Sequence, residues 1–211
     1  MPHAVLVGDS ILDNAAYTRG GPDVVSQVRR LLPPDWQATL LAVDGSTTDH
    51  VADQISRLPK QATHLILSVG GNNALMHLGV LEEPVSSMSK SIGALADIAE
   101  GFEAQYRAAI ASCLDTALPM AVCTIYNGCF EDRAFQRIAS TTLTVFNDAI
   151  IRVAIEHALA VIDLRSVCVT AEDYANPIEP SSVGGAKIAR VIVGWVCGAD
   201  TAAPATRILI A

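Results

Sequence analysis

The chain begins with the stretch AVLVGDSILDN, residues 4–14, in which four consecutive apolar residues are followed by Gly8, Asp9 and Ser10. A short apolar run bounded by a turn residue predicts a strand that is buried on both faces, as in a parallel sheet. Ser10 would then lie just past the C-terminal end of this strand, where open α/β sheets bind their ligands. The simpler interpretation of Gly-Asp-Ser is a strand-to-helix turn with a capping serine.

The composition is typical of one globular domain. The 211 residues are 51% hydrophobic and 17% charged, which is enough for a substantial core without disulfide bonds. The net charge of −8 argues against nucleic acid or an anionic membrane as partner, because both repel an acidic surface. Five widely spaced cysteines suit reduced thiols in a reducing compartment.

The N-terminus does not resemble a targeting segment. Residues 1–3 carry no positive region, and the apolar run after them is too short for a signal peptide. No stretch approaches the roughly 18 apolar residues that a transmembrane helix requires. We therefore expect a soluble, cytoplasmic protein that does not bind membranes.

Apolar runs alternate with helical patterns along the chain. Strand-like runs occur at residues 4–7, 38–43, 64–69, 120–125 and 161–164. Apolar residues recur at helical spacing in residues 23–32, 48–58, 100–117, 135–157 and 183–196. This order implies right-handed crossovers, so we expect an α/β fold in which a five-stranded parallel sheet is the middle layer of a three-layer α/β/α sandwich.

Two segments are less regular. Residues 74–98 are rich in serine and contain Pro84, and they are expected to form a lid or rim. The domain is expected to span residues 1–198, followed by a C-terminal extension at residues 199–211. This extension either docks on its own domain or exchanges as an arm in a homodimer.

The turns after the first three strands form a pattern. They carry Ser10, Gly45 and Asn72, all at the edge of the sheet where the strands end. A hydroxyl can act there as a nucleophile, while the backbone N–H groups of Ser10 and Gly45 and the Asn72 amide stabilise an oxyanion. Singly, Gly45 and Asn72 fit ordinary turns; their shared position predicts a catalytic site.

At this point the sequence resembles the SGNH/GDSL hydrolase family. Gly-Asp-Ser-Ile at residues 8–11 is similar to its first block, Gly45 to its second, and Gly-Gly-Asn-Asn at residues 70–73 to its third. The resemblance implies a flavodoxin-like sheet and hydrolysis of esters or thioesters through an acyl-enzyme on Ser10. Asn73 stands where the family usually has aspartate.

The last block departs from the family pattern of Asp-x-x-His-Pro. Aligning Pro180 and the following helix places Glu179 at the histidine position and Asn176 at the aspartate position. A shifted register would begin the motif at Asp173 and put Asn176 at the base position, but it loses the match to Pro180.

A carboxylate can serve as general base if its pKa suits the task. Free glutamate, near 4.3, is a weak base at pH 7, whereas a partly buried one is stronger. We expect Glu179 to activate Ser10, with Asn176 orienting it. The simpler interpretation makes Glu179 a structural cap beside an unactivated serine.

Other residues are candidates for supporting roles. His77, which follows the third block, is the best placed of the five histidines; His50 is the second candidate. Asp9, Asn73 and Asp173 are the other supporting candidates. The spacing of His, Cys, Asp and Glu does not indicate a metal site, and no phosphate-binding loop or dinucleotide motif is present, so no cofactor is expected.

The sequence therefore predicts a serine hydrolase that cleaves a small acyl ester or thioester. Two alternatives remain at this point: a catalytically impaired member that binds a ligand or acts as a scaffold, and an acyltransferase that prefers an alcohol or amine to water.

Overall fold

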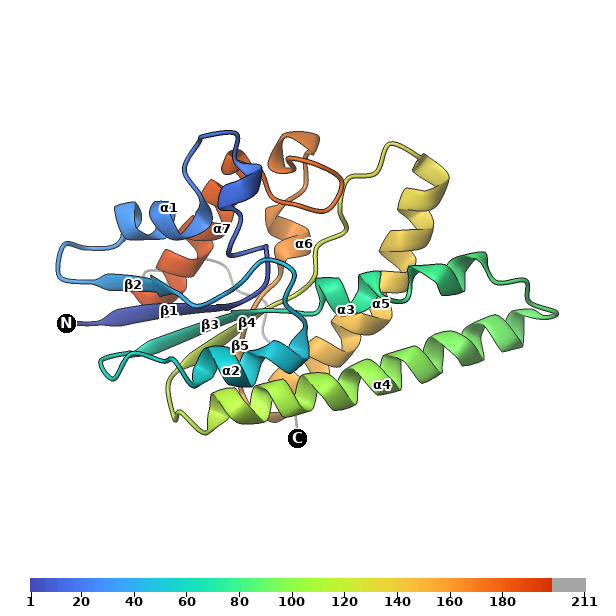
Figure 1. The fold of residues 1–211 in the computed structure, drawn as a ribbon, viewed down its shortest axis with the longest axis horizontal. Coiled ribbons are helices and arrows are strands. Elements are labelled where there is room, and N and C mark those ends of the chain that lie inside the picture. The colour runs from blue at the N-terminus through green and yellow to red at the C-terminus, as the bar shows by residue number, and fades with distance from the viewer. Residues whose placement is uncertain (199–211) are drawn as a thin grey trace.

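Five parallel strands form the centre of the computed structural model, which describes residues 1–198 (Figure 1). Their order is β2-β1-β3-β4-β5. The strands are β1 (His3–Gly8), β2 (Gln37–Leu40), β3 (His64–Ser68), β4 (Met120–Cys123) and β5 (Ala160–Ile162). The strand order reverses direction beside β1, and ligands bind at such switch points in open α/β sheets.

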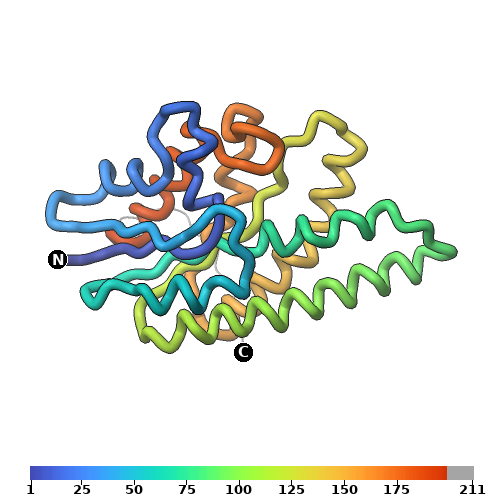
Figure 2. Tube along the Cα trace, in the orientation of Figure 1, coloured from blue at the N-terminus to red at the C-terminus, as the bar shows by residue number. Residues whose placement is uncertain are grey.

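Helices cover both faces of the sheet. Successive side chains of β1 point to opposite faces and all are buried, so each face needs a covering layer. Leu6 packs with α1 (Val24–Leu31), α6 (Leu164–Val167) and α7 (Ser182–Val196). Val5 and Val7 point to the other face, which is covered by α2 (Val51–Ile55), α4 (Met88–Leu114) and α5 (Arg133–Glu156). Figure 2 shows the two layers on either side of the strands. The predicted three-layer α/β/α fold is confirmed.

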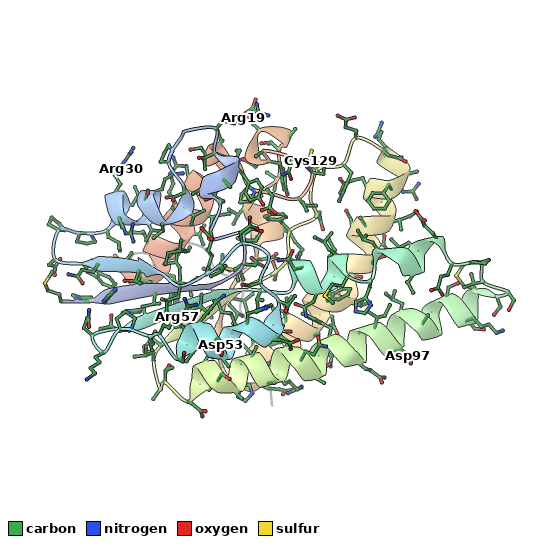
Figure 3. The ribbon with its side chains drawn as sticks, in the orientation of Figure 1. Arg19, Arg30, Asp53, Arg57, Asp97 and Cys129 are labelled. Atoms are coloured by element: carbon green, nitrogen blue, oxygen red, sulfur yellow. The ribbon has the colours of Figure 1, made fainter. Side chains whose placement is uncertain are left out.

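Charged side chains lie on the outer faces of these helices. Arg30 on α1, Asp53 on α2 and Asp97 on α4 are all exposed (Figure 3). The inner faces are apolar, so burial of these faces against the sheet holds each helix in place.

Side-chain caps set the starts of several helices. Asp23 accepts the backbone N–H of Ser26 at the start of α1, and Ser181 accepts two N–H groups at the start of α7. Asp132 does the same at the start of α5. Each cap satisfies donors that have no partner inside the helix.

The largest difference from the prediction is in residues 74–98. They form the end of α3 (Gly71–Leu75), a 3₁₀ turn at Leu78–Glu82 and the first part of α4. Helix α4 thus begins at Met88 instead of near residue 100, with Ser87 as its cap. Its first turns project from the domain (Figure 1) and expose apolar side chains, so a buried helical face is missing there. The rim expected from sequence is a helical hairpin.

Smaller differences concern boundaries. Strand β2 ends at Leu40, and α6 is a short helix that the sequence did not predict. The turn before α2 is capped by Thr47 through a capping box with His50. The expected extension at residues 199–211 lies outside the described residues, together with both of its predicted arrangements.

Helix α5 meets the length and composition criteria for a membrane-spanning helix, contrary to the expectation from sequence. In the fold, one face of this helix packs into the core. Phe146, Ile150 and Val153 on its inner face are buried against the sheet and α4.

Gly8 is the residue that brings β1 close to β3 before the chain turns toward Ser10. Its φ is +131°, and a Cβ added there would lie 1.7 Å from the backbone oxygen of Ser68. Gln54 of α2 accepts the Gly8 N–H at 2.7 Å and donates to the Gly8 carbonyl at 2.8 Å. This buried side chain therefore fixes both polar groups of the glycine.

We predict that Gly8→Ala destabilises the fold by about 3 kcal/mol or more, because the methyl group overlaps a backbone oxygen and the backbone conformation is strained. Urea unfolding measures the change. Gly79→Ala is the control, since a Cβ there has nothing within 4 Å. Equal stability of the two variants would contradict the close approach.

Candidate active site

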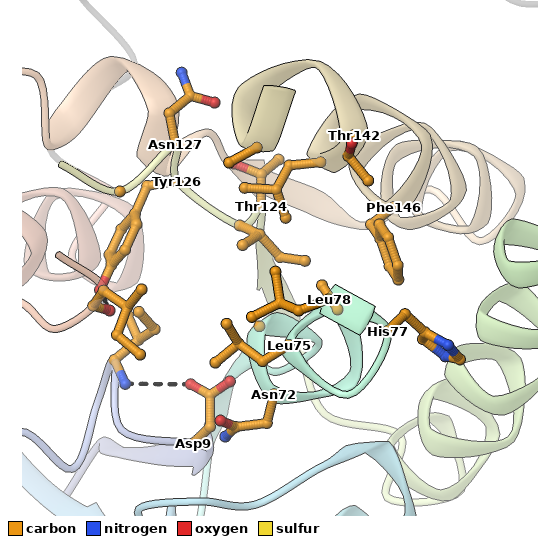
Figure 4. Close-up of a pocket in the computed structure, with 18 of the residues that line it drawn as sticks. Asp9, Asn72, Leu75, His77, Leu78, Thr124, Tyr126, Asn127, Thr142 and Phe146 are labelled. Carbon is orange, nitrogen blue, oxygen red and sulfur yellow. Dashed lines mark hydrogen bonds between the residues drawn. The ribbon is translucent and has the colours of Figure 1, made fainter. Parts of the chain in front are cut away.

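A pocket opens at the C-terminal edge of the sheet, beside the turn that follows β1 (Figure 4). Ser10, Glu179 and Asp9 are among the residues that line it. The remaining wall is mainly apolar and comes from the hairpin, α4 and α5, including Leu75, Leu78, Leu95, Ile98, Leu143 and Phe146. The pocket therefore joins a few polar groups to an apolar chamber, as ligand sites commonly do.

Ser10 and Glu179 are brought together from distant parts of the chain. The Ser10 Oγ donates a hydrogen bond to Glu179 Oε1 at 3.1 Å. Both side chains are buried, with 5% and 7% of their surfaces exposed. The other carboxylate oxygen, Oε2, is buried and has no hydrogen-bond partner among the described residues. Glu179 thus faces the serine, and the described part of the chain supplies neither a cation nor a second donor to its carboxylate.

This environment makes Glu179 a stronger base than a free glutamate. Burial, together with the nearby negative charge of Asp44, raises the pKa of Glu179 to about 7, although the Ser10 hydrogen bond opposes the shift. Desolvation disfavours the charged form of a carboxyl group. Near neutral pH the group can therefore both accept and return a proton.

Asn176 lies close to Glu179 but contacts its backbone. The Asn176 Oδ1 accepts the N–H groups of Ile178 and Glu179, each at 2.9 Å. No hydrogen bond joins the Asn176 side chain to the Glu179 carboxylate within residues 1–198. Asn176 therefore shapes the turn that presents Glu179, which differs from the direct orientation expected from sequence.

Two further residues hold the Glu179 turn. Tyr126 donates its hydroxyl hydrogen to the Ile178 carbonyl at 2.7 Å, and Asn14 donates to the Pro180 carbonyl at 3.1 Å. Asn14 also accepts the first N–H of α1, from Val24, so it links the segment after Ser10 to the Glu179 turn. The roles of these residues and of Gln54 could not be predicted from the sequence, because single polar residues in apolar segments give no sign of their distant partners.

Of the three residues predicted for the oxyanion hole, Ser10 and Asn72 line the pocket, whereas Gly45 does not. Asn72 lines the pocket with Ser10, and one of its amide N–H groups donates to the Ser46 carbonyl at 2.9 Å. Gly45 lies on the neighbouring exposed turn, with φ of +80°. Its backbone N–H has no acceptor in the described part of the chain.

Asn73 and Asp173 have structural contacts. Asn73 bonds to Thr48 and to Gln105 of α4, which ties three segments together. Asp173 is fully buried and pairs with Lys187 of α7 at 2.7 Å. Burial opposes its ionisation, but the Lys187 and Thr170 contacts outweigh it and lower the pKa of Asp173.

The histidines do not contact Ser10. His77 is exposed on the pocket wall, with its ring far from Asp9 in Figure 4. His50 accepts the Thr47 N–H, and His64 packs between two tryptophan rings at the opposite edge of the sheet. Within residues 1–198, no three His, Cys, Asp or Glu side chains are grouped so as to hold a metal ion.

Known structures share this fold at low sequence identity. A lipase from a goat rumen metagenome superposes with a TM-score of 0.69 and 17% identity, covering 91% of this chain and 96% of that one. An extracellular lipase from Streptomyces rimosus gives 0.65 and 15%, covering 91% and 98%. An aryl esterase from M. smegmatis gives 0.62 and 12%, covering 94% and 99%.

No curated protein matches the chain in sequence. The model of the GDSL-like lipase/acylhydrolase family matches residues 6–184, a stretch that contains Ser10, Gly45, Asn72 and Glu179. The chain therefore belongs to the GDSL-like lipase/acylhydrolase family.

Proposed function

We propose that this protein hydrolyses acyl esters, with Ser10 as the nucleophile and Glu179 as the general base. The observation that carries the proposal is the buried hydrogen bond from Ser10 Oγ to Glu179 Oε1, at 3.1 Å, beside an apolar pocket. A nucleophile within hydrogen-bond reach of a base is the geometry that covalent catalysis requires.

The reaction follows from this pair. Glu179 takes the hydroxyl proton as Ser10 Oγ bonds to the ester carbon, and the carbonyl electron pair moves onto its oxygen. The backbone N–H of Ser10 and the amide of Asn72 stabilise the resulting oxyanion. When the bond to the alcohol breaks, Glu179 returns its proton to the departing oxygen. A water molecule, deprotonated by Glu179, then bonds to the acyl carbon; the bond to Ser10 Oγ breaks, and Glu179 returns the proton to that oxygen as the acid leaves.

The pocket favours a substrate with an apolar acyl chain. Leucine, isoleucine and phenylalanine side chains line the chamber that extends from Ser10, and they offer an acyl chain few polar partners. Each methylene group buried in such a chamber contributes about 0.8 kcal/mol.

We predict that Ser10→Ala lowers kcat for 4-nitrophenyl butyrate by at least about 10³-fold, because the nucleophile is lost. Glu179→Gln is expected to lower kcat by about 10²- to 10⁴-fold, since the amide cannot take the proton.

The parent rate should rise with pH through a midpoint at about 7, as Glu179 ionises. Rates are measured from pH 5 to 9.

Correct folding of both variants is checked by circular dichroism. A parent that is no faster than Ser10→Ala would contradict the proposal and favour a ligand-binding or scaffold role. Faster consumption of ester when an alcohol is added would indicate acyl transfer instead of hydrolysis.

The apolar pocket also predicts a dependence on the length of the acyl chain. The value of kcat/KM should rise about fourfold for each methylene group from acetate to hexanoate, because each added group enters the apolar chamber. Thr142→Phe, on the α5 wall of the pocket (Figure 4), should reduce the gain for the longer chains. Thr141→Phe places the same ring on an exposed position as a control. Equal effects of the two substitutions would argue against acyl binding in the chamber.

A further inference from the structure

Asp9 is a buried acid in the pocket that the proposed reaction does not yet use. It directly precedes Ser10, is 2% exposed and lines the same pocket. Figure 4 shows its carboxyl group pointing into the pocket beside Asn72. In the proposed reaction, the Asp9 carboxyl group would therefore lie next to the ester that Ser10 attacks.

The two carboxyl oxygens of Asp9 have different surroundings. Oδ1 accepts the backbone N–H of Ile11 at 3.2 Å. Oδ2 lies beside the start of α3, which carries Asn72: a Cβ added to Gly71 would be 3.8 Å from this oxygen. Since Oδ1 must be the acceptor, a proton on this carboxyl group belongs on Oδ2.

Charged groups around Asp9 oppose its ionisation. The charges of Glu179 and Asp44 act on Asp9, and both groups are acidic. Cys123 and Tyr126 also face Asp9 but stay neutral, because burial raises the pKa of the Cys123 thiol to about 12 and that of Tyr126 well above its ordinary value. Asp9 forms no ion pair with lysine, arginine or histidine among residues 1–198. An ionised Asp9 would therefore be an uncompensated buried charge.

The two neighbouring acids consequently lose their protons in order. Burial, Glu179 and Asp44 raise the pKa of Asp9 to about 8, against the Ile11 hydrogen bond that lowers it. Glu179, with a pKa of about 7, ionises first. Between about pH 7 and pH 8 the predominant form of the pair therefore has an ionised Glu179 and a neutral Asp9.

We propose that Asp9 is a neutral carboxylic acid whose Oδ2–H donates a hydrogen bond to the ester carbonyl oxygen, and to the oxyanion formed from it, beside Asn72. The proposal rests on the proposed esterase function. Asp9 adds a hydrogen-bond donor to the oxyanion site. One N–H of the Asn72 amide is already bonded to Ser46, and Gly45 lies on an exposed turn. Asp9 keeps its proton throughout, so none of its covalent bonds changes.

Asp9→Asn and Asp9→Leu test this role through ester hydrolysis. The side-chain amide of Asp9→Asn can accept the Ile11 N–H through its oxygen and donate an N–H from the position of Oδ2. The rate of this variant at pH 7 should therefore stay within about tenfold of the parent rate. Asp9→Leu has no donor and should lose about 10²-fold. The parent should lose activity above a midpoint of about pH 8, whereas Asp9→Asn should not, because its amide does not ionise.

Asp44→Asn is the electrostatic control. It removes a negative charge that acts on both acids from an exposed position. Both limbs of its pH profile should move to lower pH, and the basic limb should remain. A basic limb that disappears in this variant would overturn the assignment to Asp9.

Stability against pH gives a readout that does not need turnover. The folded state keeps the Asp9 proton up to about pH 8, while the unfolded chain loses it near pH 4, so the parent loses stability as pH rises between these values. Asp9→Asn lacks this loss. The difference in urea midpoint between variant and parent should therefore grow in favour of the variant from pH 4 to pH 8.

Two results would overturn the proposal: a flat stability difference, or an Asp9→Asn protein as slow as folded Asp9→Leu while the parent remains active. The second would mean that an ionised carboxylate is required. Failure of the esterase function itself is recognised separately, as equal rates in the parent and Ser10→Ala.

Discussion

The site depends on one constraint: a carboxylate is buried against a serine hydroxyl, and no cation among residues 1–198 neutralises it. Glu179 is 7% exposed, bonds to Ser10 and leaves Oε2 without a partner among the described residues. Burial of an acid normally costs stability, because its charged form loses hydration. The same burial gives Glu179 the proton affinity that a base for serine needs near neutral pH.

The scaffold maintains this arrangement through polar side chains that clamp the backbone. Gln54 holds both polar groups of Gly8, and Asn147 holds the N–H and carbonyl of Ile125 at the end of β4 in the same manner. Tyr126 and Asn176 fix the turn that carries Glu179. The Gln54 and Asn147 amides thus bond to backbone groups where β1 and β4 give way to the turns that line the pocket, so these polar groups are satisfied without regular structure.

The sequence predicted the sheet, and it predicted that the turns carrying Ser10 and Asn72 lie at one edge of it, because both depend on local signals. Apolar runs and helix periods identified the five strands and most helices. Turn residues after β1 and β3 indicated where Ser10 and Asn72 would lie. The start of α4 could not be predicted, because the apolar residues of its first turns, such as Met88 and Ile92, are exposed and form no buried stripe. The contacts of Asn14, Gln54 and Tyr126, and the raised pKa of Asp9, depend on residues distant in sequence, which no local pattern reveals.

The most direct test of the central claim is the rate at which a fluorophosphonate labels Ser10, measured from pH 5 to 9 in the parent and in Glu179→Gln, with the labelled residue identified by mass spectrometry. If Glu179 activates the serine, the parent is labelled at Ser10 at a rate that rises through a midpoint at about pH 7. Glu179→Gln should then be slower by about 10²-fold or more. Labelling of both proteins at the same rate across this range would contradict the account.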